Sequence, residues 1–337
     1  MNQKELPVIV CSGTPREMGR QYGEQAAELI RRNLEQFALR RDSGMLEAMQ
    51  RTLQDYAPAV LEELRGISEG AGVGFELLLS YNHWELNPDD HDRCTVFALH
   101  SDDAGLLIAK NNDSPADEDG RFVIRKGQCE NGLPFLQVTY AGFLSGLDMI
   151  NAAGLCNTHG SVGSAFARNG NRLDIRLHLY QLLQSCRSVK ELTSNLRRVP
   201  LTGKGFTIAV GDAEGNSVIL DAAVPFIAER AVNRKFAFST NLYEYPGLEN
   251  ADRRPAAGRN ICLWRNGYLK WIEQQDPPRT LARLQKVAAS HDPWAPCRHG
   301  GIHGSVTDWS VIFMAQQKKV LIAHGHPCEK PYLEIAL

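Results

Sequence analysis

The sequence lacks any pair of cysteines spaced closely enough to form a CxxC motif. Its eight cysteines are scattered singly over 337 residues, at Cys11, Cys94, Cys129, Cys156, Cys186, Cys262, Cys297 and Cys328. This spacing is unlike a disulfide framework or a zinc ribbon and is typical of reduced thiols. We therefore expect most of these cysteines to be buried core residues.

Excess charge of one sign and long hydrophobic runs are also missing. The chain has 37 Lys plus Arg against 39 Asp plus Glu, a formal net charge of −2, which offers no broad surface for nucleic acid or an anionic membrane. No apolar run approaches the roughly 18 residues of a membrane span, and the N-terminal stretch from Leu6 to Cys11 is interrupted by Pro7. We expect a cytoplasmic protein with a small-molecule partner and neither a nucleic-acid nor a membrane partner.

The sequence does have a clear change of period near residue 94. From Thr14 to Leu86 apolar residues recur at helical spacing, and Thr14, Pro15 and Glu17 form a capping-box start. Strands are predicted, first as an antiparallel meander, over 94–100, 105–113, 121–127, 135–142 and 145–160, then over 205–223, 234–241 and 309–325; helices are predicted over 172–186, 188–199, 261–271 and 280–289. This order favours an α+β fold in which two packed sheets carry helices outside.

Cys94 stands at the junction between the helical region and the first strand, behind the charged run 89–93. If the peptide bond between Arg93 and Cys94 were cut, the new N-terminal cysteine would carry its own base. Its α-amine, with a pKa of about 7.7–8.0, can accept the thiol proton. Taken alone, however, a cysteine that opens a strand is more often a small buried apolar residue.

The strand expected after that of Cys94 ends in polar residues. A hairpin would return Asp113 to Cys94, with Lys110 and Asn111 just before it. A carboxylate there can orient an ammonium group, and asparagines can donate hydrogen bonds to a developing oxyanion. Asp113 could equally cap the turn before Pro115.

Five motifs extend this pattern over nearly the whole chain. They are "GTPREMGRQYGEQAAELI", "VLEELRGISEGAGVGFELLLSYNHWE", "CTVFAL", "GLLIAKNND" and "SVIFMAQQKKVLIAHGHPCE". In this order they resemble the cysteine-type N-terminal-nucleophile (Ntn) hydrolases of the C45 type, the acyl-CoA:6-aminopenicillanic acid (isopenicillin N) acyltransferases. More distantly, the sequence is similar to the choloylglycine hydrolases and penicillin V acylases.

The resemblance implies a four-layer αββα sandwich made as one precursor, a zymogen that cuts itself before its nucleophile. Here residues 1–93 would form a helical N-terminal segment that stays docked, as a small subunit, on the catalytic core 94–337 within one integrated domain. The family often has Gly before the cysteine, whereas this sequence has Arg93.

The resemblance also implies roles for individual residues. Cys94 would be the nucleophile, its α-amine the general base, and Asp113 the residue that orients that amine. Asn241, in "FSTNLYEY", would be the main oxyanion donor and Asn157, in "GLCNTHG", the second. Either asparagine could instead satisfy backbone groups at a strand end.

Three further residues are weaker candidates for the same site. Lys110 stands where the related acylases more often carry Arg, so it keeps the charge but loses the planar fork. Asn111 neighbours it, and Ser310, in "DWSVIF", matches a family serine on the closing hairpin.

We therefore expect an amide-bond hydrolase that forms an acyl thioester on Cys94 and uses no cofactor and no metal. An acyltransferase that moves an acyl group from acyl-CoA or a carrier onto an amine is the first alternative. A catalytically silent scaffold and a metal-dependent hydrolase are the others. For the latter the residues would be Cys297, His299, His303, His324, His326 and Cys328, whose Cys-x-His and His-x-His spacings match no strong zinc template. The oligomeric state stays open.

Overall fold

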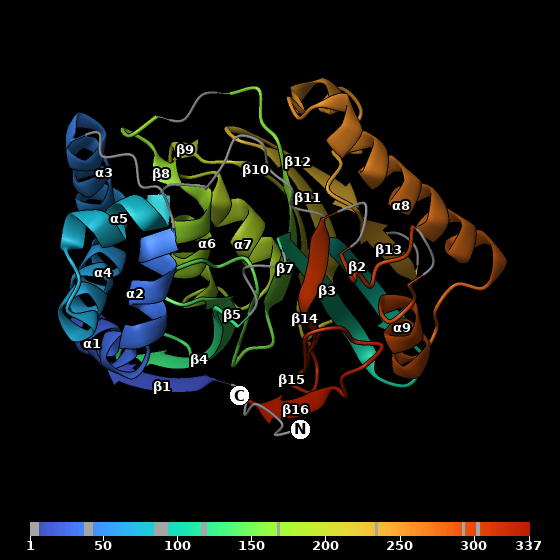
Figure 1. Ribbon diagram of the computed structural model, residues 1–337, viewed down its shortest axis with the longest axis horizontal. Coiled ribbons are helices and arrows are strands. Elements are labelled where there is room, and N and C mark those ends of the chain that lie inside the picture. The colour runs from blue at the N-terminus through green and yellow to red at the C-terminus, as the bar shows by residue number, and fades with distance from the viewer. Residues whose placement is uncertain are drawn as a thin grey trace.

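Two β-sheets lie face to face in this protein, and helices cover the outer face of each (Figure 1). The computed structural model describes residues 7–36, 43–83, 94–115, 120–166, 169–232, 235–291, 294–300 and 304–337. The α+β prediction and its αββα layering are confirmed by this arrangement. Among the described helices, none has the length and apolar character needed to cross a bilayer.

The larger sheet has eight strands. Their spatial order is β1 (Val8–Gly13), β4 (Phe122–Cys129), β5 (Phe135–Tyr140), β6 (Met149–Asn151), β7 (Cys156–Val162), β10 (Gly205–Gly211), β11 (Ser217–Ala223) and β12 (Phe226–Ala231). Its outer layer contains α1 (Pro15–Gln25), α2 (Ala27–Gln36), α3 (Ser43–Tyr56), α4 (Pro58–Ala71), α5 (Phe75–His83), α6 (Ile175–Leu183) and α7 (Val189–Leu196). A short parallel pair, β8 (Leu173–Asp174) and β9 (Leu201–Thr202), lies beside α6.

The smaller sheet has six strands. Their order is β13 (Phe236–Ser239), β2 (Thr95–Ser101), β3 (Gly105–Pro115), β14 (Ser305–Met314), β15 (Lys319–His324) and β16 (Leu333–Ala336). Two helices, α8 (Ala256–Gln275) and α9 (Leu281–Ala288), pack on its outer face. Between the two sheets lies a separate apolar cluster to which both contribute, for example through Val96, Ile108, Ile124 and Leu136.

The strand positions were predicted well from the sequence, and their pairing in part. The expected antiparallel meander is confirmed for β2 with β3 and for β4 through β7, but it is wrong at the step from β3 to β4, because β3 pairs with β14 and β4 belongs to the other sheet. These strands are buried on both faces, so their apolar pattern does not indicate which neighbour they pair with. The N-terminal stretch also differs from the helical expectation, since it forms β1 and pairs parallel to β4.

Helices α1 and α4 touch through their backbones. A Cβ atom added at Gly19 would lie 2.1 Å from the Glu63 carbonyl oxygen, and one at Gly66 would lie 2.1 Å from the Arg16 carbonyl oxygen. Gly23 and Gly70 repeat the same contact one turn further on. Only glycine permits this approach, which explains the paired glycines in both helical motifs.

A buried charged cluster fixes this helical layer to the larger sheet. Arg125 of β4 is fully buried and forms an ion pair with Glu63 of α4. Its Nη1 also donates to the Tyr180 hydroxyl at 2.9 Å, and its guanidinium lies 4.6 Å from the centre of the Tyr22 ring. Removing one member of such a pair leaves an uncompensated buried charge, so the cluster specifies one docking position for α1, α4 and α6.

Replacing Gly19 by Ala should destabilise the protein. Helix propensity alone favours Ala by about 1 kcal/mol, but overpacking costs about 1–3 kcal/mol or more, and the obstructing atom here is backbone. We expect a lower urea midpoint for Gly19→Ala. The matched control is Gly267→Ala on the exposed face of α8, where a Cβ would meet nothing within 4 Å and the midpoint should rise. Equal stability of Gly19→Ala and wild type would contradict the close helix contact.

Candidate active site

Cys94 lies immediately before β2, an inner strand of the smaller sheet, with only 3% of its surface exposed. Its Sγ is 3.7 Å from Asn112 Oδ1 and 3.9 Å from the Asp113 main-chain oxygen. The register pairs Thr95 with Asn111, which places Cys94 opposite Asn112. The predicted hairpin return is therefore confirmed, whereas Arg93 and the rest of the charged run before Cys94 lie outside the described residues.

Strand β3 buries five consecutive polar residues, Lys110 to Ser114. Burying a polar group is unfavourable unless it is hydrogen-bonded, and burying a charge is more so. Because side chains alternate along a strand, this run supplies polar groups to both faces of the sheet. The partners on each face therefore show what the run can do.

Lys110 occupies a buried charged cluster between strands of the two sheets. Its Nζ lies 2.9 Å from Asp148 Oδ2 and 3.2 Å from His159 Nδ1. Burial opposes ionisation of Asp148, but Lys110 and His159 outweigh it and lower the pKa of this carboxyl. The charge of Lys110 is thus held in place, and Trp309 covers it at 5.9 Å from the ring centre.

Asp113 directs its carboxyl group toward α8 and β14. Its Oδ1 accepts a hydrogen bond from Thr307 Oγ1 at 2.7 Å, and its Oδ2 lies 3.3 Å from Arg265 Nη1. Burial raises the pKa of Asp113 to about 7, although Arg265 and Arg298 favour the carboxylate. The group therefore changes charge near neutral pH, next to the main chain that contacts the Cys94 thiol.

Arg265 connects Asp113 to the predicted oxyanion donor. Its Nη2 donates to Asn241 Oδ1 at 2.9 Å, while Asn241 Nδ2 donates to the Ser161 carbonyl at 2.8 Å. Strand β13 pairs Ser239 with Val96, so continuing that register brings Asn241 level with Cys94. Asn241 itself has a left-handed backbone, with φ of 62°.

The remaining candidates lie in other surroundings. Asn157 belongs to β7 in the larger sheet, where its buried amide nitrogen donates to the Gly146 carbonyl. Ser310 Oγ donates to Asn111 Oδ1 at 2.7 Å, and Asn111 Nδ2 donates to the Ala288 carbonyl of α9 at 2.8 Å. Asn111 thus points to the face opposite Asn112 and Cys94, and Ser310 accompanies it there.

Among the residues that complete these networks, sequence reasoning missed Arg265, Thr307, Asp148 and His159. Arg265 falls on the buried stripe of α8 with Cys262, Leu269 and Ile272. A charged residue in such a stripe is unfavourable to bury without a partner, and that anomaly could have marked it. Asp148 likewise interrupts the apolar run around Met149.

The residues considered for a metal were also brought together in part. Cys297 and His299 lie close to His326 and, on another side, to Cys328. His324 instead packs edge-on against Phe122, with ring centres 4.9 Å apart, and His303 lies outside the described residues.

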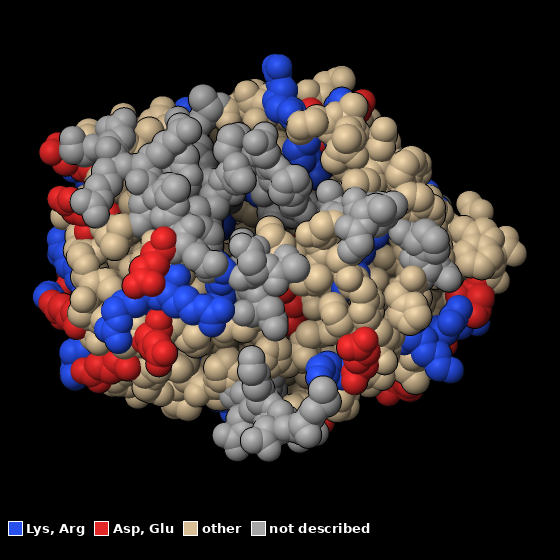
Figure 2. Space-filling model, in the orientation of Figure 1, with Lys and Arg blue, Asp and Glu red and all other residues tan. Residues whose placement is uncertain are grey.

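Charges of both signs are interspersed over the face shown in Figure 2, most clearly along the edge formed by the N-terminal helices. Exposed pairs there include Arg16 with Glu69 and Arg20 with Glu24. The described part of this face therefore presents a mixed surface, in keeping with the net charge of −2.

No family model matches the sequence, and no curated protein matches it. Among solved structures, the chain is similar to a mutant of the conjugated bile acid hydrolase from Clostridium perfringens, with 11% identity, 72% of this chain and 92% of that chain covered, and a TM-score of 0.45. Penicillin V acylase from Agrobacterium tumefaciens shares 16% identity, with 72% of this chain and 86% of that chain covered and a TM-score of 0.44. A Caenorhabditis elegans ortholog of N-acylethanolamine-hydrolyzing acid amidase shares 13% identity, with 66% of this chain and 93% of that chain covered and a TM-score of 0.42.

Asp113 should make the stability of the protein pH-dependent. Its carboxyl ionises near 3.8 in an unfolded chain but near 7 in the folded protein, so between these values only the folded state keeps the proton. The free energy of unfolding should therefore fall from about pH 4 to about pH 7 and level off above, by on the order of a few kcal/mol.

Asp113→Asn removes this contribution and should flatten the profile measured by urea unfolding at each pH. Asp55→Asn, on the exposed face of α3, is the matched control and should run parallel to wild type. Parallel profiles for wild type and Asp113→Asn would contradict the raised pKa.

Proposed function

We propose that the protein is an autoproteolytic cysteine Ntn hydrolase that cleaves a small-molecule amide through an acyl thioester on Cys94. The observation that carries the proposal is the position of Cys94: it opens an inner strand of an αββα sandwich, opposite Asn112 and beside the buried polar end of β3. A packing role for Cys94 would not require Lys110 to Ser114 to be polar as well as buried.

Maturation would proceed at the Arg93–Cys94 bond. The Cys94 thiol attacks the Arg93 carbonyl, the C–N bond breaks, and the thiol proton passes to the departing nitrogen. Water then hydrolyses the resulting thioester, which gives a carboxylate on Arg93 and restores the thiol beside a free α-amine. This amine is the base that the catalytic cycle needs.

The same groups then act on a substrate amide. The α-amine takes the proton from the thiol as sulfur attacks the amide carbonyl, and it returns that proton to the leaving amine. The acyl group stays on Cys94 as a thioester until water, deprotonated by the α-amine, releases it as an acid. An acceptor amine in place of water would give acyl transfer from an amide, acyl-CoA or carrier donor, by the same thioester.

The contacts support different roles for the predicted residues. Asp113 can orient the α-amine in its ionised form, because Arg265 and Thr307 fix its carboxyl beside the chain that contacts Cys94. Asn241 has a second amide hydrogen available for an oxyanion, since Ser161 takes one of the two. Asn157 stays the secondary candidate for the oxyanion donor. Lys110 forms a buried ion pair with Asp148 between the two sheets.

The two halves of a cleaved chain would remain associated. Strand β1 pairs with β4, and Arg125 of the core binds Glu63 of α4. Residues from before the cut thus contribute both a strand and a helical layer to the fold, so cleavage would not release the first 93 residues.

Intact mass spectrometry tests the nucleophile and the cut together. Wild type should give two fragments, 1–93 and 94–337, that co-elute in native size exclusion. Cys94→Ala should give one uncut chain of the full mass. Cys129→Ala is the matched control and should mature like wild type. An uncut wild type that still hydrolyses amides would sink the N-terminal-nucleophile mechanism.

Replacing Asn241 by Gly tests the oxyanion donor, because Gly keeps the left-handed backbone while removing the amide group. With a panel of acyl p-nitroanilides, mature Asn241→Gly should lose about 10²–10³-fold in kcat. Asn171→Gly, at an exposed position, is the control and should retain turnover. Undiminished kcat in mature Asn241→Gly would exclude the assignment.

Adding a primary amine acceptor to the wild-type assay distinguishes acyl transfer from hydrolysis by the product that forms.

A further inference from the structure

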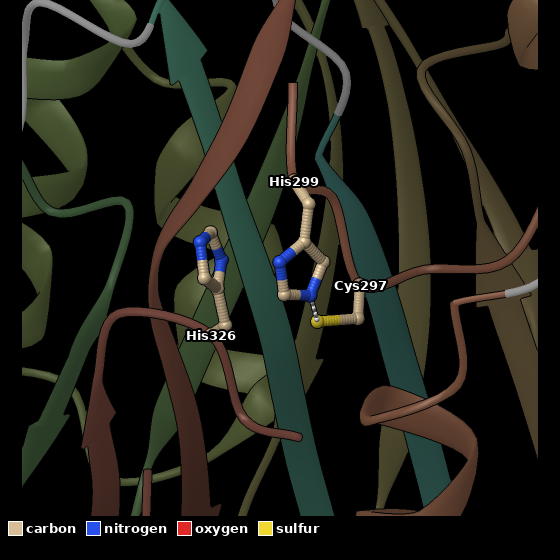
Figure 3. A group of neighbouring side chains, drawn as sticks. All are labelled: Cys297, His299 and His326. Carbon is tan, nitrogen blue, oxygen red and sulfur yellow. Dashed lines mark hydrogen bonds between the residues drawn. The ribbon is translucent and has the colours of Figure 1, made fainter. Parts of the chain in front are cut away.

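Two cysteines and two histidines from two segments far apart in the sequence lie near the start of β14. Cys297 and His299 precede that strand, and His326 and Cys328 follow β15. Figure 3 shows the rings of His299 and His326 next to each other, with a hydrogen bond between His299 Nε2 and the Cys297 thiol. The sequence indicated these four residues among six metal-ligand candidates, but not which of them meet, because each segment alone is only a two-ligand Cys-x-His or His-x-Cys motif.

The spacing of three of these atoms, the thiols of Cys297 and Cys328 and Nε2 of His299, fits three corners of a tetrahedral metal site. Cys297 Sγ lies 3.6 Å from both Cys328 Sγ and His299 Nε2, and His299 Nε2 lies 3.1 Å from Cys328 Sγ. His326, whose ligand atom lies within 4.8 Å of those of Cys297 and His299, would supply the fourth corner. Tetrahedral Zn²⁺, with Zn–S of about 2.3 Å and Zn–N of about 2.0–2.1 Å, requires edges of about 3.8 Å between sulfurs and about 3.5 Å between sulfur and nitrogen.

We propose that Cys297, His299, His326 and Cys328 form a structural Cys₂His₂ zinc site. All four positions of the tetrahedron are supplied by protein, which is the pattern of structural rather than catalytic zinc. Both thiols lose their protons to solvent when the ion binds. His299 would ligate through Nε2, and Glu329, 3.7 Å from its Nδ1, supplies the carboxylate that orients such a ring.

The site would fix the segment that supports Asp113. Arg298 stands between two of the ligands, and its backbone exchanges hydrogen bonds with Thr307, the residue whose hydroxyl binds Asp113. On the other side, the Gly325 nitrogen donates to the Asp308 carbonyl at 2.6 Å. Zinc would therefore join the two loops that flank the start of β14, without touching Cys94.

Metal content of the untagged protein tests the proposal. After reconstitution with Zn²⁺ under reducing conditions and dialysis, mass-spectrometric elemental analysis should find about one zinc per chain. The double variant Cys297→Ser/Cys328→Ser should lose at least about nine-tenths of it, and Cys129→Ser/Cys186→Ser should keep it. Replacing zinc by Co²⁺ should give the visible d–d bands of tetrahedral cobalt–thiolate in wild type and not in the double variant.

A second variant distinguishes loss of the metal site from misfolding of the double variant. His326→Gln leaves both thiols in place and should weaken Co²⁺ affinity by at least about tenfold. All measurements are repeated in the Cys94→Ala background, where metal binding should be unchanged because Cys94 is not a ligand. Failure of wild type to bind either metal, retention of zinc by the double variant, or a Cys297–Cys328 disulfide in the reduced preparation would overturn the zinc site and leave the Cys94 proposal intact.

Discussion

The antiparallel register between β2 and β3 is the constraint on which the candidate site depends. It places Cys94 opposite Asn112 and against the main chain of Asp113. The neighbouring β13 adds Asn241 at the same level by its own register with β2. Because a shift of one residue turns every side chain to the opposite face, both registers must hold for these groups to meet.

This arrangement buries charged groups, which is unfavourable, and two separate networks of ion pairs and hydrogen bonds offset the cost. Lys110 is neutralised by Asp148 on the side of the larger sheet, and Asp113 by Arg265 on the side of α8. A charge in a low-dielectric interior is tolerated when it is paired and hydrogen-bonded. The incomplete compensation of Asp113 raises its pKa to about 7, so that the residue whose main chain contacts Cys94 carries a carboxyl that titrates near neutrality.

The helical layer before Cys94 is integral to the fold rather than an appendage. Backbone contact at Gly19 and Gly66 brings α1 and α4 together, and that approach lets Glu63 reach Arg125 on the sheet. Strand β1 extends the same sheet from the same part of the chain. Specific close packing and a buried ion pair thus replace the loose hydrophobic contact that an amphipathic pattern alone would predict.

The sequence by itself determined the layers and most strand and helix positions, because apolar periodicity reports burial on a local scale. It also singled out Cys94 and Asp113, since a polar run at the end of an apolar strand is locally anomalous. Only the tertiary structure decided that β4 lies in the larger sheet rather than beside β3, that Arg265 joins Asp113 to Asn241, and that Ser310 faces away from Cys94. These are contacts between residues far apart in the chain, and local pattern carries no information about which distant partners pair.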